Sequence, residues 1–314
     1  MALAYGFCIV EQWENRAEMR QSRLRGRLLA SGGAERRDGH GIILGEFVKL
    51  AGGRRAQIAL IVVGAEKDPE VGETYSRAFA ELGVKETTVV QITQREEAGQ
   101  EEALRAVKRA TGVFFPGGDQ LHVTALLGGT PMDKAIHDRY DAGVIIAGSS
   151  AGAAMMSDAI IIRGNAERYP ILGGIEMGHG LEFLLGAILD THFSQRGRYG
   201  RLISAVAQYP RVLGIGIDEN TAIVVIDGIL TVIGEGAVTI IDASASSYTN
   251  LPLIRMGDNL SLHDIRLHIL ADGYQFDLNK RRPITQEVVS KKTGRTRKRV
   301  TSSRARQPKP RVRV

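Results

Sequence analysis

The sequence is poor in cysteine and aromatic residues and has no long hydrophobic run. Cys8 is the single cysteine among 314 residues, so no intrachain disulfide can form, and a disulfide-rich secreted scaffold is excluded. No uninterrupted apolar stretch approaches the ~20 residues that span a bilayer. Residues 2–10 are apolar, but no basic residue precedes them and Glu11 follows at once, which is not typical of a signal peptide. These absences predict a cytoplasmic protein that makes no contact with membranes.

The positive charge of the chain is confined to its C-terminus. Residues 280–314 contain 14 Lys and Arg against one acid, Glu287, whereas residues 1–279 contain 27 basic and 34 acidic residues. The net charge of +6 is therefore a property of the tail, and it does not indicate a nucleic-acid-binding protein. At most, we expect a weak contact between the basic tail and nucleic acid.

Glycine and β-branched apolar runs are abundant and indicate an α/β protein. Strand-like runs alternate with helix-like stretches through the first half of the chain, which predicts a doubly wound, mostly parallel sheet with helices on both faces. After about residue 210, short apolar runs joined by tight turns predict antiparallel strands that extend the same sheet. The expected strands are 27–33, 56–65, 86–92 and 112–120, and the expected helices are 41–53, 70–83, 100–112 and 131–141.

A short run of small residues follows the next predicted strand. Residues 148–152, Gly-Ser-Ser-Ala-Gly, fit the G-x-S-x-G pattern of a nucleophile elbow, a tight turn that lifts one serine hydroxyl above the sheet edge. The helix expected behind the turn would supply backbone N–H donors to an oxyanion. Ser150 is therefore the candidate nucleophile. The alternative is that the small residues only let a helix pack closely against a strand.

A nucleophilic serine needs a base, and the base needs an orienting acid. Among the seven histidines, His192 stands out because it follows an apolar run that would end at the ligand-binding edge of a parallel sheet. His179, in a glycine-rich loop, is the second candidate. Glu219 also follows an apolar run and is the candidate acid, with Asp218 and Asp190 as competitors. The order Ser, His, Glu differs from that of the α/β-hydrolases.

Three arginines follow His192 within nine residues. Arg196, Arg198 and Arg201 lie at the start of a helix predicted over 197–208. Guanidinium groups bind carboxylates in a bidentate fashion, so we interpret the cluster as a clamp for an anionic substrate. A solvated basic helix face is the alternative.

The loop that ends the run at 112–120 offers further polar groups. Gly117 or Gly118 could place a backbone N–H at the oxyanion, together with the N–H of Ala151. Our choice for the oxyanion is Gly118 and Ala151, and Gln120 could hydrogen-bond a substrate. The sequence contains no Cys/His cluster with the spacing of a metal site, so we expect neither a metal nor another cofactor.

Taken together, these segments resemble cyanophycinase, a serine peptidase family related to aspartyl dipeptidase, with a fold like that of class I glutamine amidotransferases. The resemblance spans about residues 27–282, which it implies to be a catalytic α/β domain. The composition of residues 283–314 predicts a disordered basic tail, and we expect the N-terminal extension at 1–26 to be loosely ordered. The resemblance is carried by residues 28–35, 114–120, 146–161, 190–202 and 214–222.

The resemblance implies a role for each site residue. Ser150 is the nucleophile, His192 the general base and Glu219 the orienting acid. The implied substrate is cyanophycin, a poly-aspartate with arginine on each β-carboxyl, which a homodimeric exopeptidase would cut to β-Asp-Arg dipeptides. Thr191 stands where the family often has Gln, and Ser149 where it often has Thr. The implied substrate-binding residues are Gln120, Asp190, Thr191, Arg196, Arg198 and Arg201.

Two other functions remain open from the sequence. One is an aspartyl or isoaspartyl dipeptidase that acts on small peptides. The other is a non-catalytic relative that binds a polyanion or a polymer granule, for which the basic tail would supply the charge.

Overall fold

The computed structural model describes residues 26–64, 70–164 and 169–284, all within a compact unit that ends at Ile284. The predicted extension at 1–26, apart from Gly26, lies outside these residues, and so does the basic tail from residue 285. The first two residues assigned to the tail, Pro283 and Ile284, complete the last strand, β17 (Arg282–Ile284). The domain boundaries otherwise stay a prediction.

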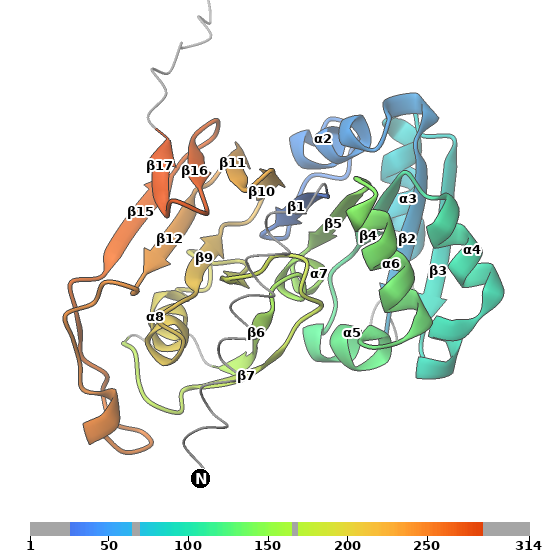
Figure 1. Cartoon of the computed structure of the whole chain (residues 1–314). Coiled ribbons are helices and arrows are strands. Elements are labelled where there is room, and N and C mark those ends of the chain that lie inside the picture. The colour runs from blue at the N-terminus through green and yellow to red at the C-terminus, as the bar shows by residue number, and fades with distance from the viewer. Residues whose placement is uncertain (1–25, 65–69, 165–168, 285–314) are drawn as a thin grey trace, which may run out of the picture. The chain divides into compact units, whose positions relative to one another are not determined.

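A nine-stranded sheet forms the centre of the molecule, as the sequence predicts (Figure 1). Its five parallel strands are apolar runs that are buried except in β3, as expected for strands covered on both faces. Antiparallel strands continue the sheet beyond β1. The order is β17, β16 (Gln275–Asp277), β11 (Ile229–Gly234), β10 (Thr221–Ile226), β1 (Arg27–Ser31), β5 (Ile145–Ser149), β4 (Gly112–Phe115), β2 (Gln57–Val63) and β3 (Glu86–Ile92).

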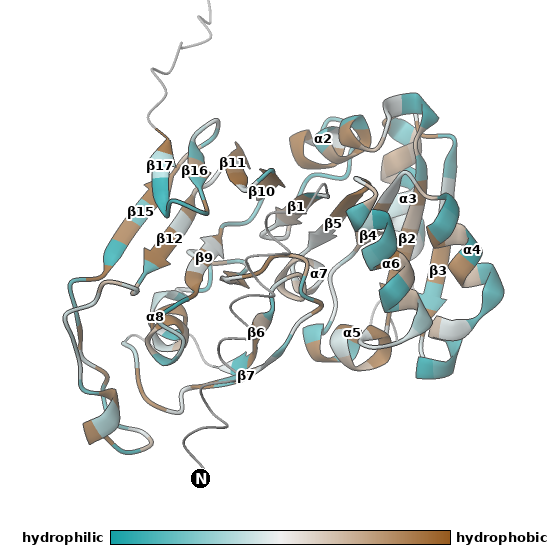
Figure 2. Ribbon diagram, viewed as in Figure 1, coloured by the Kyte–Doolittle hydropathy of each residue, from teal (hydrophilic) through white to brown (hydrophobic). Residues whose placement is uncertain are grey.

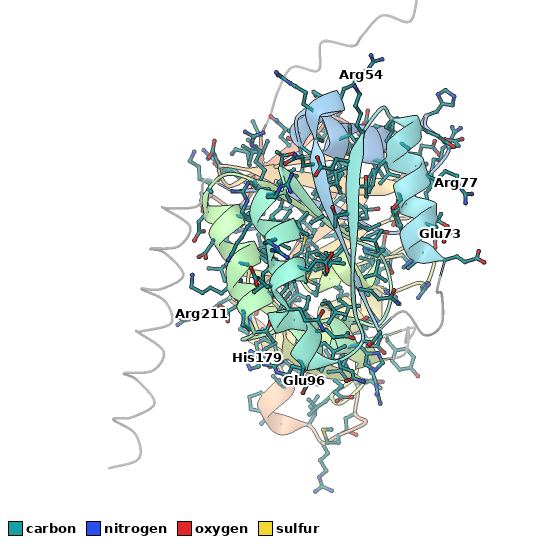
Figure 3. The ribbon with its side chains drawn as sticks, turned by 90° about the vertical axis from the view of Figure 1, so that its right-hand side faces the viewer. Arg54, Glu73, Arg77, Glu96, His179 and Arg211 are labelled. Atoms are coloured by element: carbon teal, nitrogen blue, oxygen red, sulfur yellow. The ribbon has the colours of Figure 1, made fainter. Side chains whose placement is uncertain are left out.

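Helices cover both faces of the parallel half. On one face, Phe47 of α2 (Ile42–Leu50) and Phe79 of α3 (Val71–Glu81) pack with Phe114 of β4. The opposite face carries α4 (Glu101–Arg109), α5 (Gln120–Leu127) and α6 (Pro131–Asp141). Figure 2 shows the polar segments of α4 and α6 on their outer sides, and in Figure 3 the charged side chains of Glu73 and Arg77 point outward from α3. Burial of the apolar faces therefore places these helices on the sheet.

A second sheet corrects one prediction. The runs that become β10 and β11 extend the main sheet, but β9 (Leu213–Ile217) and β12 (Val238–Asp242) do not. They pair with β8 (Ala187–Asp190) and β15 (Arg266–Leu270) in a separate four-stranded sheet, and α8 (Tyr199–Gln208) packs on it. The reason is visible in β9, where a β-carbon on Gly214 would lie 2.7 Å from Val206 of α8. Gly214 lets this strand lie directly beneath α8.

The remaining elements are short. Antiparallel β6 (Ala159–Gly164) and β7 (Ile175–His179) form a hairpin, and β13 (Tyr248–Thr249) pairs with β14 (Leu262–His263). The others are the single turn α7 (Ala151–Ala154) and the 3-10 helices Gly53–Arg55, Arg95–Gly99 and Leu251–Leu253. Within the described ranges, none of the helices combines the length and the apolar character that a bilayer span requires.

Two parallel strand pairs bring distant segments together. Ser31 of β1 lies opposite Ser149 of β5, and Asp190 of β8 lies opposite Gly216 of β9. The N–H of His192 donates to the carbonyl of Gly32, at 2.8 Å, which joins the end of β8 to the end of β1. The loops after β1, β5, β8 and β9 therefore meet at one place.

Candidate active site

Ser150 occupies a strained turn between β5 and α7. Its φ of 53° and ψ of −114° are sparsely populated for a residue with a side chain, and such strain persists only where the surroundings enforce it. A β-carbon on Gly148 would lie 2.1 Å from the carbonyl oxygen of Gly152, and one on Gly152 would lie 2.4 Å from that of Phe115. Gly148 is required because the turn folds back onto itself, and Gly152 because the turn lies against the end of β4; this is the geometry of a nucleophile elbow.

A chain of hydrogen bonds links Ser150, His192 and Glu219. The Oγ of Ser150 lies 2.9 Å from Nε2 of His192, and Nδ1 of His192 lies 2.7 Å from Oε1 of Glu219. Gly33 packs directly against the imidazole ring, where a β-carbon would lie 2.4 Å from Cε1. This arrangement can transfer a proton from the hydroxyl to the imidazole while the carboxylate holds the ring.

The competing carboxylates are engaged elsewhere. Asp218 accepts hydrogen bonds from the backbone N–H groups of Ser194, at 3.0 Å, and Ala237, at 3.1 Å, and so ties two loops together. The backbone N–H of Glu219 donates to Oε1 of Gln195, at 3.0 Å, which fixes the start of the β9–β10 connection. Of the three acids considered from the sequence, Glu219 is thus the one bonded to the imidazole.

The electrostatic surroundings keep His192 neutral. Burial lowers the pKa of His192 below its ordinary value, and the positive charges of Arg196 and Arg198 lower it further. The hydrogen bond and the charge of Glu219 act in the opposite direction but do not reverse the shift. A neutral imidazole is the form that can accept a proton from serine.

Asp190 lies between two of the predicted substrate-binding arginines. Arg201 donates from Nε to Oδ2, at 2.7 Å, and from Nη2 to Oδ1, at 2.5 Å, while Arg198 donates to Oδ1, at 3.1 Å. The carboxylate is 1% exposed. Arg198 also donates to the carbonyl of Thr191, at 2.6 Å, whose side chain is buried beside His192. The structure thus brings Asp190, Arg198 and Arg201 together as one ion-paired cluster, to which Thr191 is hydrogen-bonded through its carbonyl.

Arg196 and Gln120 occupy different settings. Arg196 is exposed, and its charge acts on His192. The side-chain amide of Gln120 donates to the carbonyls of Ile161, at 3.0 Å, and Ile162, at 2.9 Å. It therefore fastens the start of α5 to β6 and leaves its amide oxygen for another partner.

The expected oxyanion donors surround the elbow. A β-carbon on Gly117 would lie 3.5 Å from Cβ and 4.0 Å from Oγ of Ser150, whereas one on Gly118 would face the carbonyl of Val63, at 3.8 Å. The α-carbon of Gly117 thus faces Ser150, and that of Gly118 faces the end of β2. Ala151 begins α7, a helix of a single turn, where a backbone N–H has no intrahelical acceptor.

His179 and Glu35 lie outside the hydrogen-bonded chain. His179, labelled in Figure 3, is exposed at the end of the β6–β7 hairpin, while the bond from Ser150 goes to His192. Sequence reasoning missed Glu35, a buried carboxylate behind the elbow, although the segment 28–35 had been recognised. In the part of the chain that the structure describes, no three His, Cys, Asp or Glu side chains are grouped as metal ligands.

Comparison with known proteins identifies the family of the chain. The sequence model of peptidase family S51 matches residues 27–233. The cyanophycinase of Synechococcus elongatus is 38% identical over 256 residues, which cover 81% of this chain and 80% of the relative. That of Geminocystis herdmanii (strain PCC 6308) is 38% identical over 263 residues, 83% of this chain and 97% of the relative.

A solved structure shares the fold. The crystal structure of a peptidase from an acI-B1 Actinobacterium superposes with a TM-score of 0.59 at 22% identity, covering 81% of this chain and 98% of the other. The family match spans more than half of the chain, and the alignments with these curated relatives cover about four fifths of it. The chain is therefore a serine peptidase and belongs to peptidase family S51.

Proposed function

We propose that this protein is a cyanophycinase, a serine-type exopeptidase that hydrolyses multi-L-arginyl-poly-L-aspartate to β-Asp-Arg dipeptides. The observation that carries the chemistry is the continuous hydrogen-bonded chain from Ser150 through His192 to Glu219. The substrate is supported by the 38% identity to cyanophycinases over 81–83% of the chain.

The reaction begins with attack of the Ser150 oxygen on the backbone carbonyl between two aspartyl units. His192 takes the hydroxyl proton on Nε2 and then passes it to the leaving amine, while Glu219 keeps the other ring proton on Nδ1. Backbone N–H groups of Ala151 and of the Gly117–Gly118 loop stabilise the oxyanion. Water, which His192 activates in the same way, then hydrolyses the ester of the acyl-enzyme and frees Ser150.

The arginines of the site suit the side groups of this polymer. Each arginine of cyanophycin carries a free carboxylate and a guanidinium group. Arg196 is exposed beside His192 and is the group we assign to the carboxylate. Since both oxygens of Asp190 already accept from Arg198 and Arg201, we assign to these three a shared part in shaping the pocket. Gln120 and Thr191 complete the proposed subsite.

The proposal includes a homodimer that works in the cytoplasm without a cofactor, with the catalytic domain at 27–282. Light scattering coupled to size-exclusion chromatography tests the dimer. A truncated chain that ends at Ile284, which preserves β17, tests the tail: we expect unchanged dipeptide release, and weaker binding to granules or RNA would assign the tail an anchoring role.

The central experiment is incubation of the purified protein with insoluble cyanophycin and detection of soluble β-Asp-Arg by mass spectrometry. We expect release in the presence and absence of EDTA, and none from Ser150→Ala. Release by Ser150→Ala, or release that requires added metal, would contradict the mechanism. Cleavage of aspartyl or isoaspartyl dipeptides without cleavage of the polymer would instead make the protein a dipeptidase.

A further inference from the structure

A carboxylate that the proposed mechanism does not use lies directly behind the nucleophile. The side chain of Glu35 is fully buried, and each of its oxygens has partners. Oε2 accepts the hydroxyls of Ser149, at 2.7 Å, and Ser31, at 2.9 Å, and Oε1 accepts the hydroxyl of Tyr75. Nε of Arg37 lies 3.8 Å from Oε1, with its guanidinium 4.4 Å above the ring of Tyr75.

Such a group is costly to bury and is retained only where its partners compensate it. Burial raises the pKa of Tyr75, so the phenol keeps its proton and donates a hydrogen bond to Glu35. The hydroxyls of Ser31 and Ser149 also need an acceptor, because both residues are buried. The carboxylate is thus the shared acceptor of three hydroxyls from three separate parts of the chain.

The two serines bonded to Oε2 control both halves of the Ser150–His192 pair. Ser149 directly precedes Ser150, and the carbonyl of Ser31 accepts the N–H of Ser150, at 3.1 Å. The Oγ of Ser31 also accepts the N–H of Gly33, at 3.2 Å, and Gly33 packs against the imidazole of His192. One carboxylate oxygen therefore joins the turn that carries the nucleophile to the loop that supports the base.

We propose that Glu35 is a positioning residue that sets the distance between Ser150 and His192 through the hydroxyls of Ser149 and Ser31. The inference rests on the proposed serine mechanism and adds to it a residue that touches no substrate. Glu35 acts on catalytic geometry, so its loss should lower kcat and the reactivity of Ser150 and leave KM unchanged.

The isosteric pair Ser149→Thr and Ser149→Val tests this directly. Both variants add the same methyl group at the same buried position, but the threonine keeps the hydroxyl that donates to Glu35 and the valine loses it. We expect kcat of Ser149→Val to be about tenfold below that of Ser149→Thr, with KM values that agree within about twofold. Equal kcat values in the two folded variants would overturn the proposal.

A second readout separates this inference from the identity of the substrate. A small alkyl fluorophosphonate reacts with an activated serine: the Ser150 oxygen forms a bond to phosphorus, fluoride leaves, and His192 takes the hydroxyl proton. The inactivation rate of Ser149→Val should fall in the same proportion as kcat. If the protein does not cleave cyanophycin but this difference remains, the proposed substrate is wrong and the role of Glu35 stands. If the wild type does not react, both the nucleophile and the inference are wrong.

Variants of the carboxylate and of its far partner complete the test. The amide oxygen of Glu35→Gln can still accept both seryl hydroxyls, so this variant should retain more activity than Glu35→Ala. Tyr75→Phe removes the bond to the other oxygen, so its melting temperature should fall while kcat stays within about twofold of the wild type. A loss of kcat in Tyr75→Phe equal to that in Ser149→Val would show a general structural role instead.

Discussion

Replacing Gly33 with alanine tests how closely the imidazole of His192 is held. A β-carbon at this position would lie 2.4 Å from Cε1 and 2.6 Å from Nε2 of His192. Ordinary van der Waals contact begins at 3.4 Å, so the ring must withdraw by about 1 Å. The same ring is 2.9 Å from the Oγ of Ser150, and the bond is lost if the ring moves that far from it.

The size of the effect follows from this displacement. Misplacing a reacting group by about 1 Å lowers the rate by about 10²-fold, which corresponds to roughly 2.7 kcal/mol of activation free energy. The backbone adds a smaller cost, because a φ of 97° is unfavourable for alanine by about 1–2 kcal/mol. That cost lowers the melting temperature by roughly 2–8 °C but leaves the protein folded at assay temperature.

The assay compares kcat and KM for dipeptide release, with thermal unfolding measured by circular dichroism. We expect kcat of Gly33→Ala to fall about 10²-fold while KM changes little. Gly45→Ala is the matched control: Gly45 lies in α2 with nothing within 4 Å of an added β-carbon, so it should gain about 1 kcal/mol of stability at unchanged kcat. A kcat of folded Gly33→Ala within about threefold of the wild type would refute the claim that this contact holds the base.

Three further substitutions address the acid, the pH dependence and the ion-paired cluster. Glu219→Gln removes the charge that fixes the ring tautomer, so kcat should fall by about 10³–10⁴-fold; a loss below tenfold would assign the orienting role elsewhere. Arg196→Gln removes a positive charge that lowers the pKa of His192, so the acid limb of kcat/KM should move to higher pH; a limb that stays in place or moves to lower pH would contradict this. Asp190→Asn leaves Arg198 and Arg201 without their counter-charge and should cost about 3 kcal/mol in a denaturant melt; an unchanged transition would show that the pairing contributes little.

The parallel half of the fold and the elbow were predictable because their signals are local. Strands covered on both faces need continuous apolar runs, and β2 and β5 have them. The elbow needs glycines where its backbone closely approaches other backbone, and Gly148 and Gly152 stand at those positions. Ser150, His192 and Glu219 each follow an apolar run, so each could be nominated from the sequence.

The arrangement of the second sheet could not be predicted, because no local signal distinguishes β9 from β10. Both are short apolar runs, and the packing of α8 on Gly214 assigns β9 to the other sheet. His192 was expected at the edge of the main sheet, yet β8 belongs to the second sheet. His192 reaches Ser150 because its backbone N–H is bonded to Gly32 at the end of β1, and the β9–β10 connection, which crosses between the sheets, brings Glu219 to the ring. His192 lies next to Ser150 as expected, but its strand belongs to a different sheet from the one expected.

The position of Arg196 suggests that binding of the substrate strengthens the base. In the free protein, Arg196 lowers the pKa of His192, while Arg198, which acts in the same direction, is already paired with Asp190. A substrate carboxylate that pairs with Arg196 offsets its charge, so the pKa of His192 rises in the complex and the imidazole accepts the proton of Ser150 more readily. The acid limb of kcat reports the complex and that of kcat/KM reports the free enzyme. We therefore expect the limb of kcat to lie at higher pH in the wild type and the two limbs to coincide in Arg196→Gln; a separation that survives this substitution would mean that the carboxylate binds elsewhere.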